Sequence, residues 1–169
     1  MSLTALTLAV TVLALASSPS LGVAEGRCRP TEPGPAIIVT AEGLKDRTGT
    51  LRAELYPPTD QDFLADDNIL VSAGKTFRRV VIPVPATGPV RLCIRVPRAG
   101  QYALSLVHNR GNGETFSFLR DGIGFPGNPR LGLSRPRAST AFVHAGAGNI
   151  NVSVRMNYHI GLFSFGPLR

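Results

Sequence analysis

The chain has 169 residues, and its 18 Lys and Arg residues against 11 Asp and Glu residues give a formal net charge of +7. The length suits one domain, the hydrophobic fraction of 43% argues against a disordered chain, and the roughly 18–20 consecutive apolar residues of a membrane-spanning helix do not occur, which excludes an integral membrane protein. The 18 glycines and 14 prolines favour a turn-rich β protein.

The amino-terminal residues predict export. Leu3–Ala16 is an apolar run without charge, and small residues in the pattern of a signal peptidase site end at Ala16 and again at Ala24. We favour the second site because it lies just ahead of Glu25, the first charged residue. Residues 1–24 are therefore expected to be a signal peptide, and the mature protein is expected in the periplasm or outside the cell. An uncleaved anchor and a first helix of the domain are the alternatives.

Residues 25–35 are rich in Pro and Gly and are expected to be irregular, whereas residues 36–158 repeatedly alternate apolar and polar side chains. Within them, the acidic stretch Thr59–Asn68 is expected to hold one helical turn around Phe63 and Leu64. The predicted strands are Ile37–Glu42, Thr50–Tyr56, Phe77–Val84, Val90–Val96, Gln101–Asn109, Ala138–His144 and Asn149–Tyr158. About seven strands separated by turns indicate an all-β fold, a single antiparallel β-sandwich of immunoglobulin-like or transthyretin-like layout. A long loop at residues 110–137 interrupts it, and loops of that length are usually functional or disordered.

Cys28 and Cys93 are the two cysteines, and an even pair in an exported protein predicts one disulfide. Apolar residues alternate in the strand around Cys93, which places this cysteine on the outer face together with Arg91 and Arg95. A cysteine on that face is well placed to tie down the segment that carries Cys28. Two free thiols are the alternative.

Charge is distributed unevenly along the chain. Residues 25–67 hold five basic and nine acidic side chains, whereas residues 68–169 hold thirteen basic and two acidic ones. Two interpretations stay open. Either the acidic first part lies against the basic remainder, or the basic part meets an anionic partner such as an envelope polymer or a lipid headgroup. We expect no nucleic acid partner.

Motifs of known chemistry are absent or stand in the wrong context. Gly122–Gly127 spells G-x-G-x-x-G, but no strand directly precedes it and Pro126 falls near the helix start that a dinucleotide site needs. We expect these glycines to permit tight turns. Ser134 lacks the second glycine of a nucleophile elbow, and no H-E-x-x-H or C-x-x-C pattern occurs. The sequence therefore predicts no enzyme activity and no cofactor.

Several short stretches together resemble a family of exported bacterial proteins, domain of unknown function 2141, over about residues 28–158. The stretches are Gly43-Leu44 after the first strand, Arg52–Tyr56, Phe63-Leu64, Tyr102–His108 with the Asn/Gly turn that follows it, and Gly122–Phe125 followed by Asn128. A related branch also carries one cysteine near the mature start and one in the middle strand. The family's turn looks like a calcium loop. In this chain Asn109 stands where the family's turn has Asp, and Glu114 is the one carboxylate left in the turn. We therefore expect no metal ion to bind. The resemblance implies the fold and export but no reaction.

These observations favour a non-enzymatic binding or interaction module of the bacterial envelope that acts through the 110–137 loop. The physical basis is a rigid sandwich that displays a long loop rich in Arg and Gly. The candidate contact residues are His108, Asn109, Arg110, Asn112, Arg120, Phe125, Asn128 and Arg130. One alternative is a hydrolase that pairs His108 with Glu114 or Asp121. The other is a purely structural protein whose loop covers a sandwich edge. For His108 we favour a hydrogen bond to loop backbone over catalysis.

The carboxyl-terminal tail, His159–Arg169, holds five large apolar residues in eleven. Left exposed, it would form a sticky patch. We expect it to fold back and cover one end or edge of its own sandwich, and addition as a strand to a partner is the alternative. Gly166-Pro167 should end any pairing, because Pro has no backbone donor.

Overall fold

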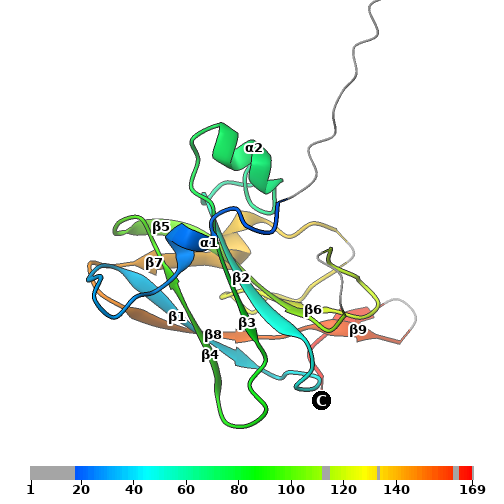
Figure 1. The fold of residues 1–169 in the computed structure, drawn as a ribbon. Coiled ribbons are helices and arrows are strands. Elements are labelled where there is room, and N and C mark those ends of the chain that lie inside the picture. The colour runs from blue at the N-terminus through cyan, green and yellow to red at the C-terminus, as the bar shows by residue number, and fades with distance from the viewer. Residues whose placement is uncertain (1–17, 112–114, 133, 162–163, 169) are drawn as a thin grey trace, which may run out of the picture.

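The computed structural model describes residues 18–111, 115–132, 134–161 and 164–168 (Figure 1). With 39% strand and 10% helix, the protein is mostly β, which confirms the predicted class. No helix within these ranges is long and apolar enough to cross a membrane. The apolar run Leu3–Ala16 of the predicted signal peptide lies outside the described residues.

One sheet has three strands in the order β4–β1–β8. They are β1 (Ala36–Glu42), β4 (Val90–Arg95) and β8 (Ile150–Arg155). Ile and Val recur in all three strands, and such β-branched residues suit the extended backbone. β1 runs antiparallel to β4 but parallel to β8. Since every other pairing among the described strands is antiparallel, β1–β8 is the one departure from the predicted antiparallel arrangement.

A second, larger sheet contains β5 (Gly100–Asn109) and has the strand order β3–β2–β5–β6. Its further strands are β2 (Thr50–Tyr56), β3 (Arg78–Pro83), β6 (Gly122–Gly124) and β7 (Phe142–Ala145). β7 pairs with the first residues of β5 and β6 with its last residues, so these two short strands share one side of β5 (Figure 1).

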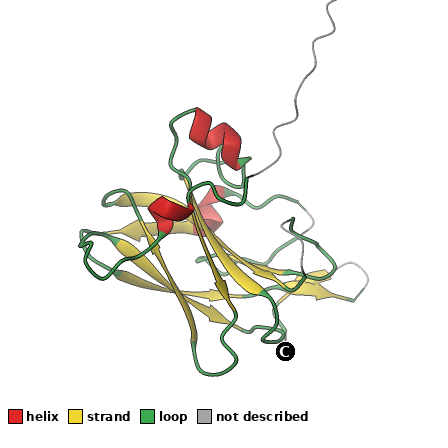
Figure 2. Ribbon diagram, in the orientation of Figure 1, coloured by secondary structure: helices red, strands yellow, loops and turns green. Residues whose placement is uncertain are grey.

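Inward side chains of both sheets form one hydrophobic core, which includes Val39 of β1 and Leu104 of β5. On β2, Leu51 and Leu55 face this core, whereas the intervening charged residues face the other side. A second cluster, around Phe63 and its aromatic neighbours, covers part of that outer face. Figure 2 shows the strands in two layers with the helical segments outside them.

Two short helices and one 3-10 turn accompany the described strands: α1 (Val23–Gly26), α2 (Asp67–Ser72) and η1 (Ala138–Ala141). At the predicted helical turn, the backbone N–H of Phe63 donates to the Thr59 carbonyl oxygen at 2.9 Å, which closes a single turn. The helix α2 follows it, capped by the Asp66 side chain, which accepts from the backbone N–H of Asn68 at 2.9 Å.

Two predicted strands are interrupted. η1 occupies the first part of the predicted strand Ala138–His144, and β7 supplies only its end. The predicted strand Asn149–Tyr158 is divided between β8 and β9 (Tyr158–Ile160).

The predicted disulfide is present. Cys28 and Cys93 are bonded, with their Cα atoms 5.9 Å apart. Leu92 and Ile94 are buried on either side of the half-buried Cys93, so the outward position of this cysteine is confirmed. The disulfide fastens the amino-terminal segment to β4, next to a β-bridge between Arg27 and Ile94.

The carboxyl-terminal tail forms a hairpin of β9 and β10 (Ser164–Gly166), which are antiparallel. Phe165 is buried, and its ring stacks on Phe118 of the long loop with the ring centroids 5.0 Å apart. The tail therefore folds back onto its own chain, as expected, but it meets the long loop rather than a free sheet edge. Pairing ends at Gly166, just before Pro167.

Candidate functional site

His108, the first predicted site residue, stands near the carboxyl end of β5 and holds the fold together there. Its side chain is fully buried, with Nε2 2.8 Å from the Thr48 carbonyl oxygen and Nδ1 2.7 Å from the Tyr158 hydroxyl. Because a carbonyl only accepts, Nε2 carries the proton and Nδ1 accepts from Tyr158. The Tyr158 oxygen in turn accepts from the backbone N–H of Lys45 at 3.1 Å. This chain of hydrogen bonds joins the turn after β1 to β5 and β9.

Burial sets the protonation of this pair. Desolvation lowers the pKa of His108 below its usual 6.5 and raises the pKa of Tyr158 to about 12. His108 is therefore neutral near pH 7, and Tyr158 keeps its proton. A carboxylate oxygen of Asp46 lies 3.9 Å from His108 Nε2, beyond hydrogen-bond reach. Of the two carboxylates predicted to pair with His108, Glu114 lies outside the described residues and Asp121 accepts from other donors.

Arg110 and Asp121 anchor the start of the long loop. Arg110 forms an ion pair with Asp46, with Nε donating to Oδ2 at 2.8 Å, and its Nη1 donates to the Arg120 carbonyl oxygen at 3.0 Å. The buried Asp121 accepts from the backbone N–H groups of Arg110 at 2.9 Å and Ser117 at 2.8 Å. Burial opposes ionisation of Asp121, but these donors prevail and lower its pKa, and the bonds from Arg110 hold the pKa of Asp46 well below its usual range. The loop therefore starts as a fixed bend.

Close packing explains the G-x-G-x-x-G stretch. A Cβ on Gly122 would collide with the Tyr158 ring, and one on Gly124 would lie 2.5 Å from the Arg155 carbonyl oxygen. A Cβ on Gly127 would lie 2.5 Å from another backbone carbonyl oxygen, that of residue 140. None of the three glycines has a positive φ. Only Gly127 lies in a turn, so the tight turns that we expected are not the main reason for these glycines; the chain here runs too close to its neighbours for side chains.

The remaining predicted residues are spread around the loop rather than gathered in one cleft. Asn109 Oδ1 accepts from the Gly111 N–H at 3.1 Å, Arg120 Nε donates to Asp121 at 3.2 Å, and Asn128 Oδ1 accepts from the Arg155 N–H at 2.7 Å. Phe125 is buried, with its ring centroid 5.5 Å from that of Phe63, and Arg130 is exposed. Asn112 lies outside the described residues. Among the predicted residues that are described, Asn109 alone lines the pocket described next.

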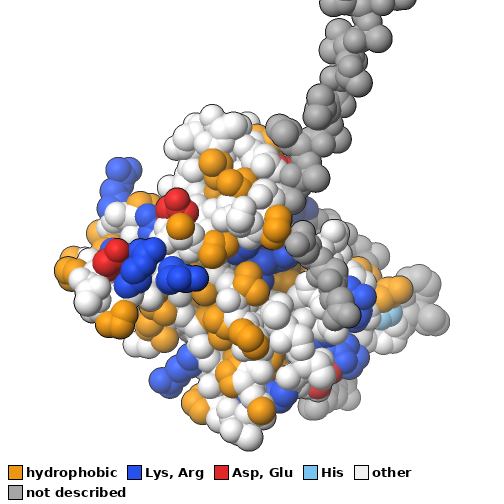
Figure 3. Space-filling model, viewed as in Figure 1, with side chains coloured by type: hydrophobic (Ala, Val, Ile, Leu, Met, Phe, Trp, Pro, Cys, Tyr) orange, Lys and Arg blue, Asp and Glu red, His pale blue; other side chains and the backbone are white. Residues whose placement is uncertain are grey.

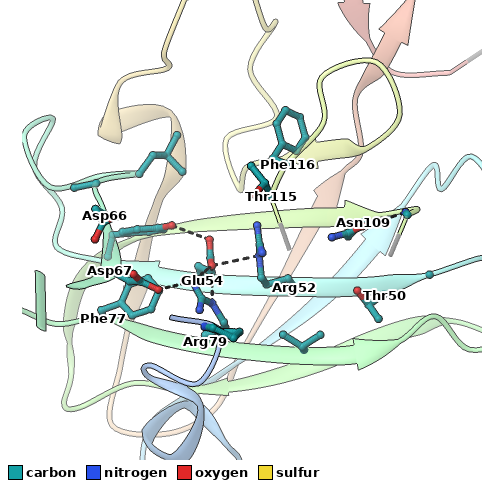
Figure 4. A pocket seen from close by; sticks show the side chains of 17 residues that line it. Thr50, Arg52, Glu54, Asp66, Asp67, Phe77, Arg79, Asn109, Thr115 and Phe116 are labelled. Atoms are coloured by element: carbon teal, nitrogen blue, oxygen red, sulfur yellow. Dashed lines mark hydrogen bonds and ion pairs between the residues drawn. The ribbon is translucent and has the colours of Figure 1, made fainter. Parts of the chain in front are cut away.

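A pocket of about 1040 Å³ opens on the outer face of the five-stranded sheet (Figure 4). Side chains of β2 and β3 form its floor. One wall consists of residues 64–67, which lead into α2, and the opposite wall includes Thr115 and Phe116 of the long loop. Small-molecule sites in proteins commonly measure roughly 300–1,000 Å³, so the pocket has the size of a ligand site.

Charged side chains on the pocket floor are already paired with one another. Arg79 donates to Glu54 through Nε at 2.8 Å and to Asp67 through Nη2 at 3.0 Å, and Arg52 Nε lies 3.3 Å from Glu54. The Tyr56 hydroxyl also donates to Glu54, at 2.7 Å. Figure 4 shows Glu54 between the two arginines, with Arg52 rising from β2 toward the loop wall. The network holds these side chains in fixed positions.

The network is largely buried. The side chains of Arg79 and Glu54 are each only 7% exposed, and that of Asp67 is 2% exposed. Burial by itself lowers the pKa of Arg79, but the two carboxylates outweigh it and raise the pKa, so the guanidinium stays charged. The Arg79 guanidinium also lies over the Phe77 ring, 5.0 Å from its centroid.

Sequence reasoning did not identify Glu54, Asp67 and Arg79 as a group. The alternation of β2 does place Arg52 and Glu54 on the face opposite its core residues, and this was the available signal. What the sequence could not reveal is that Arg79 stands opposite Glu54 in the neighbouring strand and that Asp67 pairs with it from α2. A paired network of this kind depends on strand register, which no local motif encodes.

The acidic residues in the first part of the chain form ion pairs with basic residues further along it. Carboxylates from residues 25–67 pair with later basic residues, namely Glu32 with Arg95, Asp62 with Lys75, Glu54 and Asp67 with Arg79, and Asp46 with Arg110. This supports the intramolecular interpretation of the charge asymmetry. Within the described part of the long loop, Arg130, Arg135 and Arg137 are exposed and have no ion pair. No three His, Cys, Asp or Glu side chains in the described ranges are placed to hold a metal ion.

Residues 39–153 match a bacterial family described as "Uncharacterized protein conserved in bacteria (DUF2141)". This match covers more than half of the chain. The chain belongs to the DUF2141 family. The DUF2141 match includes the pocket floor and His108, whereas Pro19 on the pocket rim, Cys28 and the β9–β10 hairpin lie outside it. No curated protein and no solved structure matches the chain.

Proposed function

We propose that this DUF2141 protein is an exported, non-enzymatic binding module of the bacterial envelope and that its ligand occupies the pocket on the outer face of β2 and β3. The observation that carries the proposal is the pocket itself: a ligand-sized hollow whose floor is a buried, fully oriented set of charged groups. Proteins seldom bury charges, because desolvation is costly unless the charges are paired. Export is supported by the disulfide and the apolar amino-terminal run.

The chemistry of the walls indicates a ligand with both polar and apolar groups. Arg52, Glu54 and Asn109 offer donors and acceptors from rigid strands, and Phe77 and Phe116 offer aromatic surface. Strands position such groups more firmly than a free loop does. In this proposal the long loop still takes part, but through its base at residues 115 and 116 rather than through the arginines further along it.

For the fold we infer a β-sandwich with immunoglobulin-like or transthyretin-like layout. The core shared by the two sheets supports a sandwich, and the ten described strands include the seven expected ones in whole or in part. In such sandwiches the outer sheet faces and the connecting loops are the surfaces open to ligands.

The alternative hydrolase is less well supported. His108 has both ring nitrogens bonded and no exposed surface, so a substrate could reach it only after the Tyr158 and Thr48 bonds had broken. A structural role remains the second alternative, and β6 supports it, because this strand of the loop covers part of one side of β5. An anionic envelope component is a candidate partner for the exposed arginines at 130, 135 and 137.

A pocket-filling variant tests the proposal. Val81 lines the pocket and is 46% exposed, whereas Val71 on α2 is similarly exposed, at 42%, but does not line it. Wild type, Val81→Trp and Val71→Trp are screened by thermal shift and calorimetry against muropeptides, chito-oligosaccharides and short peptides. We expect at least one compound to stabilise wild type and Val71→Trp but not Val81→Trp. Stabilisation of all three proteins alike, or of none, would contradict a ligand site in this pocket.

A further inference from the structure

We propose that the signal peptide is removed between Ala16 and Ser17 and that the mature protein keeps residues 18–28, which we call the strap, as a working part of the domain. The inference rests on the proposed export. It replaces the cleavage after Ala24 that the sequence favoured. Ala14 and Ala16, the small residues of the upstream site, lie outside the described residues, and the support comes from the strap itself.

The strap is hydrogen-bonded along the outer strand β3. The backbone N–H of Arg79 donates to the Gly22 carbonyl oxygen at 3.0 Å, and Arg79 Nη1 donates to the Ser18 carbonyl oxygen at 2.8 Å. Further on, Arg27 forms a β-bridge with Ile94 and Cys28 is bonded to Cys93. β3 pairs with β2 on one side, and the strap covers its other side around Arg79 (Figure 1).

Two glycines let the strap approach β3 closely. Gly22 has a φ of +72°, and a Cβ there would lie 2.8 Å from the Arg78 Cα atom. A Cβ on Gly26 would lie 2.6 Å from the Arg79 carbonyl oxygen, and Gly26 is buried. Just ahead of Gly22, Leu21 packs against the second hydrophobic cluster. A segment destined for removal has no need of this fit.

Cleavage after Ala24 would remove Ser18, Pro19, Leu21 and Gly22. Arg79 would lose two hydrogen-bond acceptors, and the edge of β3 that the strap covers would be left unpaired. The pocket would lose Pro19 from its rim. The downstream site would thus damage both the covered strand and the candidate ligand site.

Cleavage after Ala16 leaves all of these contacts intact. Signal peptidase would add one water across the Ala16–Ser17 peptide bond, leaving a carboxylate on the released peptide and an amino group on Ser17. Ala14 and Ala16 supply the small residues that such a site requires, directly after the apolar run. The mature chain is then eight residues longer than one that starts at Glu25.

Intact-mass and amino-terminal sequencing of protein purified from the periplasm of an expressing bacterium decide the question. The expected first residue is Ser17. Ala16→Leu should block this processing, whereas the control Ala24→Leu, at an exposed position, should be processed as wild type. A mature protein that starts at Glu25 would overturn the inference and leave export standing. A chain that stays unprocessed would overturn both.

Stability gives a second readout that does not depend on export. Oxidised protein that starts at Ser17 should melt several degrees above oxidised protein that starts at Glu25. In the longer protein, Gly22→Ala should lower the melting temperature, whereas Gly148→Ala should leave it unchanged, because a Cβ on Gly148 meets no atom within 4 Å. Equal melting temperatures for the two lengths, or for Gly22→Ala and wild type, would contradict a structural strap.

Discussion

His108 shows how a residue that looks functional in the sequence can serve the fold. From the sequence His108 was a candidate contact residue, although a hydrogen bond to loop backbone was favoured over catalysis. In the structure its two nitrogens are used by Tyr158 and Thr48, so that three separate segments meet on one ring. The requirement for a neutral ring then links stability to pH.

We predict that stability decreases as the pH falls below 6.5. Burial lowers the pKa of His108 in the folded protein, whereas the unfolded chain keeps a value near 6.5. Between these two pKa values the unfolded chain binds a proton at His108 that the folded protein does not bind. The free energy of unfolding therefore falls by at most about 1.4 kcal/mol for each unit by which the pH is lowered. The measurement is the free energy of unfolding in urea from pH 7.5 to about 5.

His108→Gln is the matched variant, because an amide can still donate to Thr48 and accept from Tyr158. Between pH 7.5 and about 5, the free energy of unfolding of this variant should change less with pH than that of wild type. Asp46 should not contribute to this slope. Its pKa is lowered in the folded protein, so its contribution to stability is lost only as the pH falls below its usual value of 3.8. An unchanged slope in His108→Gln would show that another group is responsible.

Arg79 is the residue on which we expect the pocket floor to depend. Arg79→Met removes the shared partner of two buried carboxylates and should lower the free energy of unfolding by about 3 kcal/mol. Arg91→Met, on the exposed face of β4, is the control and should change it by less than about 0.5 kcal/mol. Urea denaturation of both variants measures this, and equal effects would mean that the network contributes little.

At the scale of elements, periodicity predicted the long strands well and the short ones poorly. β1, β2 and β5 lie close to their predicted bounds because several alternating residues mark each of them. β6, β9 and β10 have three residues each, too few for any period to show. η1 was predicted as strand; its buried residues Ala138 and Ala141 are three apart, which is a helical spacing rather than an alternation.

The candidate site, too, was predictable only where its residues are close together in the sequence. The sequence indicated that the long loop was special, and Thr115 and Phe116 do line the pocket. The floor could not be predicted, because Glu54 and Arg79 become neighbours only through the pairing of β2 with β3. Groups that meet through register are invisible to motif searches, whereas groups that are adjacent in the chain are not.

The β9–β10 hairpin is expected to stabilise the loop that it touches. Phe165→Ala removes a buried ring that stacks on Phe118 and should lower the free energy of unfolding by about 2 kcal/mol. Leu168→Ala, at a position that is 37% exposed, should have a much smaller effect. Chemical denaturation monitored by circular dichroism compares the two. If Phe165→Ala were as stable as wild type, the hairpin would have no part in holding the domain together.

For the whole molecule, the exposed apolar side chains are as informative as the buried ones. Ile69 and Val71 on α2 and Val81 on β3 are exposed. Figure 3 shows hydrophobic side chains over α2 and on the face below it, beside a group of basic side chains. The surface that contains the pocket is therefore mixed in character, which suits a ligand with both polar and apolar groups.

The disulfide is expected to be a major source of overall stability. It joins residues 65 positions apart, and in the chain-entropy description closing a loop of this length contributes about 4 kcal/mol. Replacing both Cys28 and Cys93 by Ser should lower the midpoint of urea denaturation accordingly. A reducing agent should then destabilise wild type but leave the double variant unaffected. If the midpoint of urea denaturation of wild type were the same with and without the reducing agent, this role would be contradicted.

The parallel pairing of β1 with β8 also constrains how the protein reaches its native state. Ile37 pairs with Ile150, so β1 and its partner strand β8 are more than a hundred residues apart in the sequence. Contacts this distant in sequence slow folding, since the chain must close a long loop before the pairing is formed. In the export that we propose, a chain that crosses the membrane amino terminus first would hold β1 with one unpaired edge until nearly all of it had crossed. The first strand of the domain is therefore among the last to have both of its neighbours, and the three-stranded sheet is complete only once β8 is available.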